Sequence, residues 1–223
     1  MKTVSSKQSA VSTNKVSASD FKLYLITDRK LFNAQCLMYL AIETVLDAGV
    51  DCIQLREKDL SGRELLDMAI WMRELTKEYQ AKLFINDRVD IALAVDADGV
   101  HLGQHSIPAR AVREISANRL LIGVSTHSID EAVEAEENGA NFITLGPIYE
   151  TPSKLQYGNP IGPDIIRKVK SGVSIPVFAI GGIKLDKIEQ VREAGSDGIA
   201  LISAILSSEN IKKTTEEFLR LLK

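Results

Sequence analysis

The stretch LDAGVDCIQL, residues 46–55, contains the pattern that decides the fold. It is typical of the last turn of a helix, a glycine that ends the helix, a polar residue and then an apolar strand. The same order returns in EENGANFITL (136–145) and REAGSDGIAL (192–201), and DADGVHLG (96–103) is a variant of it. A unit repeated in this form indicates strand–helix modules that are joined by short loops.

Outward from these repeats, short apolar runs alternate with amphipathic segments from residue 21 onward. The segment 61–79 is predicted to be a helix that begins with a capping box formed by Ser61 and Glu64. Eight strand–helix units in one chain of 223 residues predict an α/β protein with a single (β/α)8 TIM barrel over residues 21–223. An open parallel sheet stays the alternative, because a count of strands does not show closure. The strands are predicted at 22–27, 51–56, 82–86, 99–103, 120–125, 142–146, 176–181 and 198–203.

Composition excludes several classes of partner. The net charge of −3 argues against binding to nucleic acid or to a membrane surface, since both need a basic face. No apolar run approaches the length of a membrane span. Cys36 and Cys52 lack metal-type spacing, which fits free thiols in a reducing cytoplasm. Residues 1–20 are rich in Ser, Thr and Lys and predict a flexible tail without the apolar core of a secretory signal.

Polar residues gather where the predicted strands end, which is where such barrels build their active sites. Gln54, Arg56 and Lys58 alternate, so they face the same side of an extended strand and predict an anion site if that side faces the barrel mouth. Gly181-Gly182 and Ser203 follow the last two strands, where barrels commonly bind phosphate. Lys154 would join Arg56 and Lys58 in the first anion site. The sequence therefore indicates two anion sites, for one substrate with two charged ends or for two phosphorylated substrates.

Asp87 has two interpretations. With Asn86, it could cap the helix that follows. Alternatively, it could bind Mg²⁺, which in proteins takes one or two carboxylates together with phosphate oxygens and water. His127 could be an acid–base group or a structural histidine, while His101 and His105 are interpreted as packing and surface residues. Trp71 and Met72 are expected in the core.

An ordered set of motifs now carries a resemblance to a known family. The segments QLREK, FINDR, DGVHLGQ, GVSTHS, LGPIYETPSK, FAIGGI and ALISAI, between about residues 23 and 206, resemble thiamine-phosphate synthase. The resemblance implies a transferase of thiamine biosynthesis that depends on Mg²⁺. Such an enzyme joins 4-amino-2-methyl-5-(diphosphooxymethyl)pyrimidine to 4-methyl-5-(2-phosphooxyethyl)thiazole, through a stabilised pyrimidine carbocation, and releases pyrophosphate.

The resemblance also implies roles for individual residues. Arg56, Lys58, Ser125 and Lys154 would be catalytic, and Asp87 would bind Mg²⁺. The pyrimidine diphosphate would contact the four catalytic residues together with Gln54 and Asn86. The thiazole phosphate would contact Thr151, Ser153, Gly182, Ile202 and Ser203.

One position departs from the family pattern. The synthase motif has a second Mg²⁺-binding Asp where this chain has Ser106 in GQHS. The site could manage with Asp87 and substrate oxygens, or recruit Asp28. The loss of this Asp also resembles the related thiazole tautomerase, in which His127 would move the proton. A phosphate-binding barrel without catalysis is a third possibility, and the sequence does not settle whether the chain forms a homo-oligomer.

Overall fold

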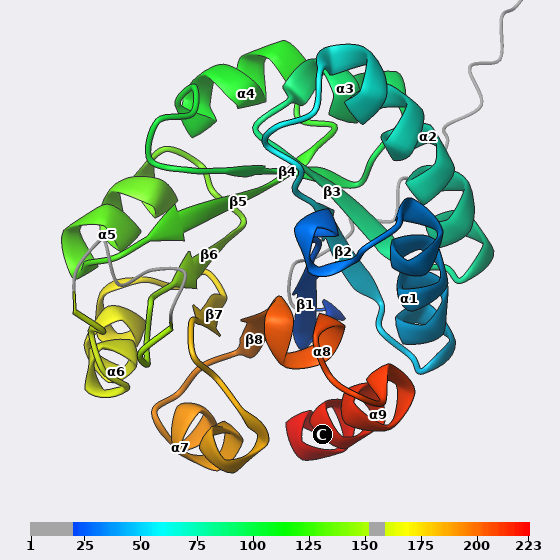
Figure 1. Cartoon of the computed structure of the whole chain (residues 1–223). Helices are drawn as coiled ribbons and strands as arrows, with labels where there is room; N and C mark the ends of the chain where they lie inside the picture. The colour runs from blue at the N-terminus through cyan, green and yellow to red at the C-terminus, as the bar shows by residue number, and fades with distance from the viewer. Residues whose placement is uncertain (1–19, 152–158) are drawn as a thin grey trace, which may run out of the picture.

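The computed structural model describes residues 20–151 and 159–223, and in these residues the predicted barrel is confirmed. Eight parallel strands pair in sequence order, and β8 closes onto β1 (Figure 1). An open sheet is therefore wrong. The tail predicted for residues 1–20 lies outside the described residues, except for Asp20.

Each strand is short, and a helix follows it before the next strand begins. The strands are β1 (Leu23–Ile26), β2 (Cys52–Leu55), β3 (Lys82–Asn86), β4 (Gly99–Leu102), β5 (Leu121–Thr126), β6 (Phe142–Leu145), β7 (Val177–Ile180) and β8 (Gly198–Leu201). The α-helices are α1 (Gln35–Asp47), α2 (Gly62–Glu78), α3 (Val89–Ala94), α4 (Ala109–Ser116), α5 (Ile129–Glu137), α6 (Asp164–Gly172), α7 (Ile188–Glu193), α8 (Ser203–Leu206) and α9 (Ile211–Leu222). The 3₁₀ turns are η2 (Arg29–Leu31) and η4 (Leu185–Lys187).

Local sequence signals start and stop several helices as predicted. The Ser61 hydroxyl accepts a hydrogen bond from the backbone N–H of Glu64, and the Glu64 carboxylate accepts one from the N–H of Ser61, so the capping box before α2 is complete. Gly139 follows α5 with φ +89° and Gly195 follows α7 with φ +95°. A positive φ is a conformation that glycine adopts without a steric cost, which explains these two repeats of the pattern.

The barrel interior is filled by aromatic rings. Phe21, Phe84, Phe142 and Phe178 are almost fully buried there, and the rings of Phe84 and Phe142 meet edge to face at 5.4 Å. The rings need glycine beside them, because a Cβ on Gly123 would lie 2.4 Å from Cζ of Phe142. This packing gives the barrel an apolar interior on which the polar ends of the strands rest.

A second, larger core lies between the strands and the helices. Met72 is fully buried in it, and Trp71 packs against it while stacking on Tyr39 at 4.0 Å. Cys52 is buried and unpaired, and Cys36 is an exposed free thiol. These placements confirm the interpretation of all four residues.

Polar side chains join the strands at their amino ends. Asp98, directly before β4, accepts hydrogen bonds from the N–H of Leu83 on β3 at 2.8 Å and from Nη1 of Arg73 on α2 at 2.6 Å. We call this arrangement an amino-end clasp, and it recurs twice. Asn141 accepts from the N–H of Ile122 at 2.8 Å and from Arg113, and Asp197 accepts from the N–H of Val177 and from Lys170 Nζ, both at 2.8 Å.

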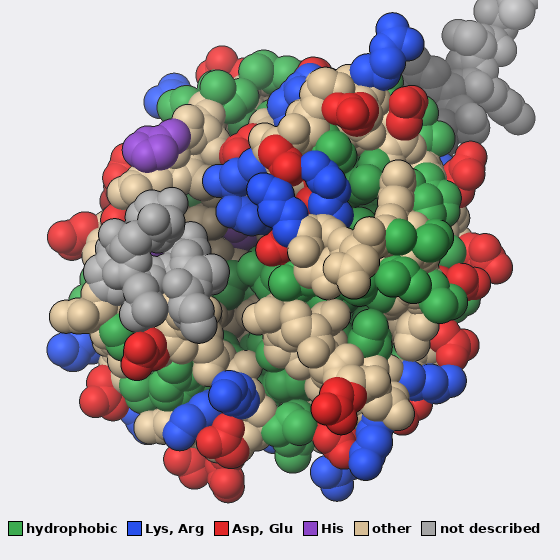
Figure 2. All heavy atoms as spheres, in the orientation of Figure 1, with side chains coloured by type: hydrophobic (Ala, Val, Ile, Leu, Met, Phe, Trp, Pro, Cys, Tyr) green, Lys and Arg blue, Asp and Glu red, His purple; other side chains and the backbone are tan. Residues whose placement is uncertain are grey.

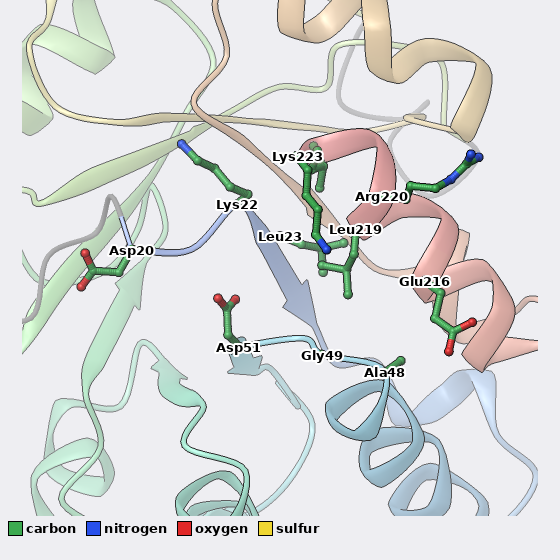
Figure 3. Close-up of a pocket in the computed structure, with 11 residues that line it drawn as sticks. Asp20, Lys22, Leu23, Ala48, Gly49, Asp51, Glu216, Leu219, Arg220 and Lys223 are labelled. Carbon is green, nitrogen blue, oxygen red and sulfur yellow. The ribbon is translucent and has the colours of Figure 1, made fainter.

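Asp51 occupies the same position before β2 but forms no such clasp. No cation in residues 20–151 and 159–223 makes an ion pair with it. It borders a pocket of about 620 Å³ between β1, α1 and α9 (Figure 3). The pocket is lined by residues that include Lys22, Asp51, Glu216, Leu219, Arg220 and Lys223. Burial raises the pKa of the Asp51 carboxyl, and nearby Lys82 opposes the shift.

No helix within residues 20–151 and 159–223 is long and apolar enough to cross a lipid bilayer.

Candidate functional site

A chain of side chains links the carboxyl ends of β2 and β3. Nε2 of Gln54 donates to Oδ1 of Asn86 at 3.0 Å, and Nδ2 of Asn86 donates to Oδ2 of Asp87 at 2.8 Å. Gln54 is 1% exposed, and its Oε1 has no hydrogen-bond partner among the described residues. Buried polar atoms are normally paired, so this oxygen is a ready acceptor for an N–H group of a ligand.

Asp87 is held by the loop that follows β4. Its backbone has φ +59°, and its N–H donates to the carbonyl oxygen of His101 at 3.0 Å. Its Oδ1 accepts hydrogen bonds from the N–H of Gly103 at 3.4 Å and from the hydroxyl of Ser106. The N-cap of α3 is Arg88, and no side chain caps that helix, so the interpretation of Asn86 or Asp87 as a side-chain cap is wrong.

These groups fit a magnesium ion only as a site with one carboxylate. Asp87 is the single acid of the cluster, and no set of three or more His, Cys, Asp or Glu residues suited to a metal exists within 20–151 and 159–223. Mg²⁺ accepts such a site when substrate phosphates and water supply the other ligands. Asp28, the other candidate acid, accepts from the N–H of Lys30 at 3.1 Å and caps the turn η2.

Arg56 and Lys58 follow β2, with Glu57 between them. Glu57 is 5% exposed and accepts hydrogen bonds from the hydroxyl of Thr27 at 2.7 Å and from the N–H of Arg29 at 3.1 Å. Thr27 in turn accepts from the N–H of Arg56 at 2.9 Å. Burial raises the pKa of Glu57, and the hydrogen bond from Thr27 opposes that shift.

Glu57 therefore fixes the backbone from which Arg56 extends. No pattern in the sequence singled out Glu57, because its partners, Thr27 and Arg29, are about 30 positions away in the chain. Figure 2, in the orientation of Figure 1, shows Lys and Arg side chains gathered beside the centre of this face, near β3 and β4.

A second polar group lies at the ends of β4, β5 and β6. Nε2 of His101 lies 3.0 Å from Oγ of Ser125 and 3.4 Å from Oγ1 of Thr144, and Nδ1 lies 3.4 Å from the hydroxyl of Tyr24. Burial lowers the pKa of His101 to about 3, with Arg56 adding to the effect and Asp87 opposing it. A pKa this low makes the imidazole a weak proton acceptor, so His101 is poorly suited to be the base for a nucleophilic serine.

His101 is buried, as predicted, but it also contacts a candidate site residue, which the sequence analysis did not foresee. His105 is exposed, as expected. His127 is also exposed, and its Nδ1 lies 3.0 Å from Oε2 of Glu131 on α5.

Backbone groups dominate the other side of the mouth. Gly181 and Gly182 have φ +98° and +65°, and a Cβ on Gly182 would lie 2.5 Å from the carbonyl oxygen of Glu150. The turn after β7 therefore requires glycine. The amide N–H groups of Gly182 and Ser203 donate to no other described residue.

The other residues predicted for this side are only partly described. Ile202 is half-buried before α8, Ser203 is exposed, and Thr151 is half-buried in the loop after β6. Ser153 and Lys154 lie outside the described residues. The mouth thus has cations, an acid and a free acceptor after β2 and β3, hydroxyls after β5 and β6, and open backbone amides after β7 and β8. Such an arrangement can bind two anionic groups on opposite sides.

Comparisons with known proteins identify the family of the chain. The model of the family described as thiamine monophosphate synthase matches residues 23–205. A thiamine-phosphate synthase from Halalkalibacterium halodurans is 46% identical over 203 residues, which are 91% of this chain and 96% of that protein. One from Clostridium acetobutylicum is 45% identical over 86% of this chain and 90% of its own length.

A solved structure extends the likeness to three dimensions. Thiamine phosphate pyrophosphorylase from Pyrococcus furiosus superimposes with a TM-score of 0.82 at 42% identity, covering 91% of this chain and 95% of its own.

Proposed function

This chain belongs to the thiamine monophosphate synthase family, and we propose how its own residues perform the reaction of a thiamine-phosphate synthase. The enzyme is a transferase of thiamine biosynthesis. It moves the pyrimidinylmethyl group of the pyrimidine diphosphate to the nitrogen of the thiazole phosphate. The relatives do not favour the tautomerase and non-catalytic alternatives, because they are named thiamine-phosphate synthases and match this chain over most of their length.

The pyrimidine diphosphate binds after β2 and β3. The free Oε1 of Gln54 accepts a hydrogen bond from the amino group of the pyrimidine, and Asn86 holds the Gln54 amide in that orientation. Arg56 and Lys58 bind the diphosphate, where a guanidinium holds two oxygens at once and an ammonium group acts as a compact charge. Lys154, which lies outside the described residues, is the third cation that the family resemblance predicts for this group. Ser125 contacts the same substrate from β5.

The chemistry needs charge neutralisation more than a protein nucleophile. When the C–O bond breaks, its electron pair leaves with the diphosphate, and the cations stabilise the growing negative charge. A Mg²⁺ ion held by Asp87 would supply further neutralisation of the diphosphate. The thiazole nitrogen then forms the new C–N bond.

The thiazole phosphate binds on the opposite side. The amide groups of Gly182 and Ser203 donate to its phosphate oxygens, Thr151 and Ser153 add hydroxyl donors, and Ile202 packs against the ring. This placement puts the two substrates face to face across the mouth of the barrel, each held by its own anion site.

One observation carries the proposal: the buried Oε1 of Gln54 has no partner in the part of the chain that the structure describes, although the Gln54 amide is held by Asn86, which in turn donates to Asp87. The test is release of pyrophosphate with both substrates present, first with Mg²⁺ and then with EDTA. We expect release only when both substrates and Mg²⁺ are present. Release from the pyrimidine diphosphate alone, or equal rates in EDTA, would contradict the proposal.

A further inference from the structure

The hydroxyl of Tyr24 lies in the aromatic interior of the barrel. Tyr24 is 0% exposed, and its ring is 5.5 Å from that of Phe84 and 5.4 Å from that of Phe142. Among the described residues, the hydroxyl has one hydrogen-bond partner, Nδ1 of His101 at 3.4 Å. The barrel thus contains a buried polar contact that the proposed reaction does not use.

The direction of this hydrogen bond follows from what surrounds it. A buried donor left unpaired destabilises the fold, and the rings around Tyr24 offer no acceptor. The phenol O–H therefore donates, and Nδ1 of His101 accepts. An Nδ1 that accepts carries no proton, so the ring proton of His101 is on Nε2.

The proton on Nε2 sets the orientation of the next hydroxyl. Oγ of Ser125 lies 3.0 Å from Nε2, closer than Oγ1 of Thr144 at 3.4 Å. Ser125 therefore accepts from His101, and its own hydrogen points away from the imidazole. The other tautomer would let Ser125 donate to Nε2, but it would leave the Tyr24 hydroxyl without an acceptor.

We propose that Tyr24 and His101 are positioning residues, which fix Ser125 as a hydrogen-bond donor toward the pyrimidine diphosphate. This inference rests on the proposed function, which puts Ser125 in contact with that substrate. Ser125 is half-buried at the mouth, so its hydrogen can reach a ligand. A fixed donor suits a substrate whose diphosphate gains negative charge as the C–O bond breaks.

The tautomer can be measured directly. The chain has three histidines, so ¹⁵N spectra of the full-length protein labelled at histidine are simple, and His101→Gln assigns the signals of residue 101. Without substrates, we expect the shift of an unprotonated nitrogen for Nδ1 and of an N–H for Nε2. A protonated Nδ1 overturns the inference.

A double-mutant cycle tests the link to Ser125. We expect Tyr24→Phe to lower kcat about tenfold with little change in KM, the effect of one misdirected hydrogen bond. In a Ser125→Ala background, the same substitution should change kcat by less than about twofold, because the effect passes through Ser125. A tenfold loss in both backgrounds overturns the inference.

The control is Tyr79→Phe, which removes a hydroxyl at the end of α2, at the opposite end of the barrel. It should leave kcat unchanged. The spectrum is recorded without substrate, so an Nδ1–H tautomer overturns this inference even if the chain makes thiamine phosphate. A wild-type chain that releases no pyrophosphate overturns the proposed function instead.

Discussion

The two ends of the barrel use the same residue types in opposite ways. At the amino end, Asp98 and Asp197 each bind a backbone N–H and a cation, so their charges are compensated within the fold. At the mouth, Oε1 of Gln54 has no partner among the described residues, and Arg56 and Lys58 form no described ion pair. Groups that the fold does not satisfy are available to a ligand.

Polar groups that the fold satisfies and those that it leaves unsatisfied should therefore respond differently to substitution, the first in stability and the second in reaction rate. A substitution in an amino-end clasp should lower stability and spare the reaction. A substitution at the mouth should spare stability and lower the reaction rate. The following predictions test that separation.

The largest effect is expected at Arg56. Arg56→Ala should lower kcat/KM for the pyrimidine diphosphate by more than about 100-fold, because it removes a bidentate partner of the leaving diphosphate. The melting temperature should stay within about 1 °C, a shift that corresponds to a negligible change in unfolding free energy. Steady-state kinetics and thermal unfolding check both parts.

The matched control is Arg119→Ala, which removes an exposed arginine before β5 at the other end of the barrel. It should leave kcat/KM unchanged. Equal kinetics for the two variants would show that Arg56 does not bind the diphosphate.

Asp98→Ala should give the reverse result. It removes the acceptor of two hydrogen bonds and leaves Arg73, whose side chain is 12% exposed, without its carboxylate. Breaking one partner of such a pair costs about 3 kcal/mol of unfolding free energy. Urea denaturation measures the loss, and kcat of the folded fraction should be unchanged. A variant that keeps its stability but loses activity would contradict the separation of the two ends.

The sequence predicted most of the fold because its signals are local. The repeated helix–glycine–strand pattern and the Ser61 capping box depend on neighbours in the chain. Seven of the eight strands lie within their predicted ranges, and β5 extends one residue further, to Thr126. The alternation predicted for residues 54, 56 and 58 holds within the strand only for Gln54, because β2 ends at Leu55 and Arg56 and Lys58 follow it.

What the sequence could not predict depends on contacts between distant residues. Glu57 lies 30 positions from the Thr27 hydroxyl that it binds, and His101 lies 77 positions from Tyr24. Asp87 could not be separated from a helix cap, because the two interpretations differ only in where one carboxylate turns. The structure shows that it turns toward Ser106.

A smaller effect is expected when the family carboxylate is restored. In Ser106→Asp, a second acid would stand beside Asp87, and two carboxylates bind Mg²⁺ more tightly than one. The Mg²⁺ concentration for half-maximal rate should fall about tenfold, since affinity at such sites follows the count of charged ligands. Mg²⁺ should also raise the melting temperature of the variant more than that of the wild type.

Ser106→Asn controls for size without adding charge. It should bind Mg²⁺ no more tightly than the wild type does. If both variants respond to Mg²⁺ alike, the ion is not held at Asp87.

The smallest effect is expected at Asp51, which precedes β2 as Asp98 precedes β4 but forms no amino-end clasp among the described residues. Its pKa is raised by burial, so the charged carboxylate is less favourable in the folded state than in the unfolded state. Asp51→Asn should therefore stabilise the fold at pH 7, by only a few tenths of a kcal/mol because the carboxylate is only partly removed from solvent, which screens its charge. The gain should vanish as the pH falls below the ordinary carboxyl pKa, where Asp51 is protonated in both states. Urea denaturation at pH 7 and at about pH 3.5 measures the difference.

The equivalent change at Asp98 should destabilise at pH 7, so opposite signs at two equivalent positions would show that the clasp, and not the position, stabilises the amino end. A loss of stability in Asp51→Asn would mean that Asp51 has a partner of its own.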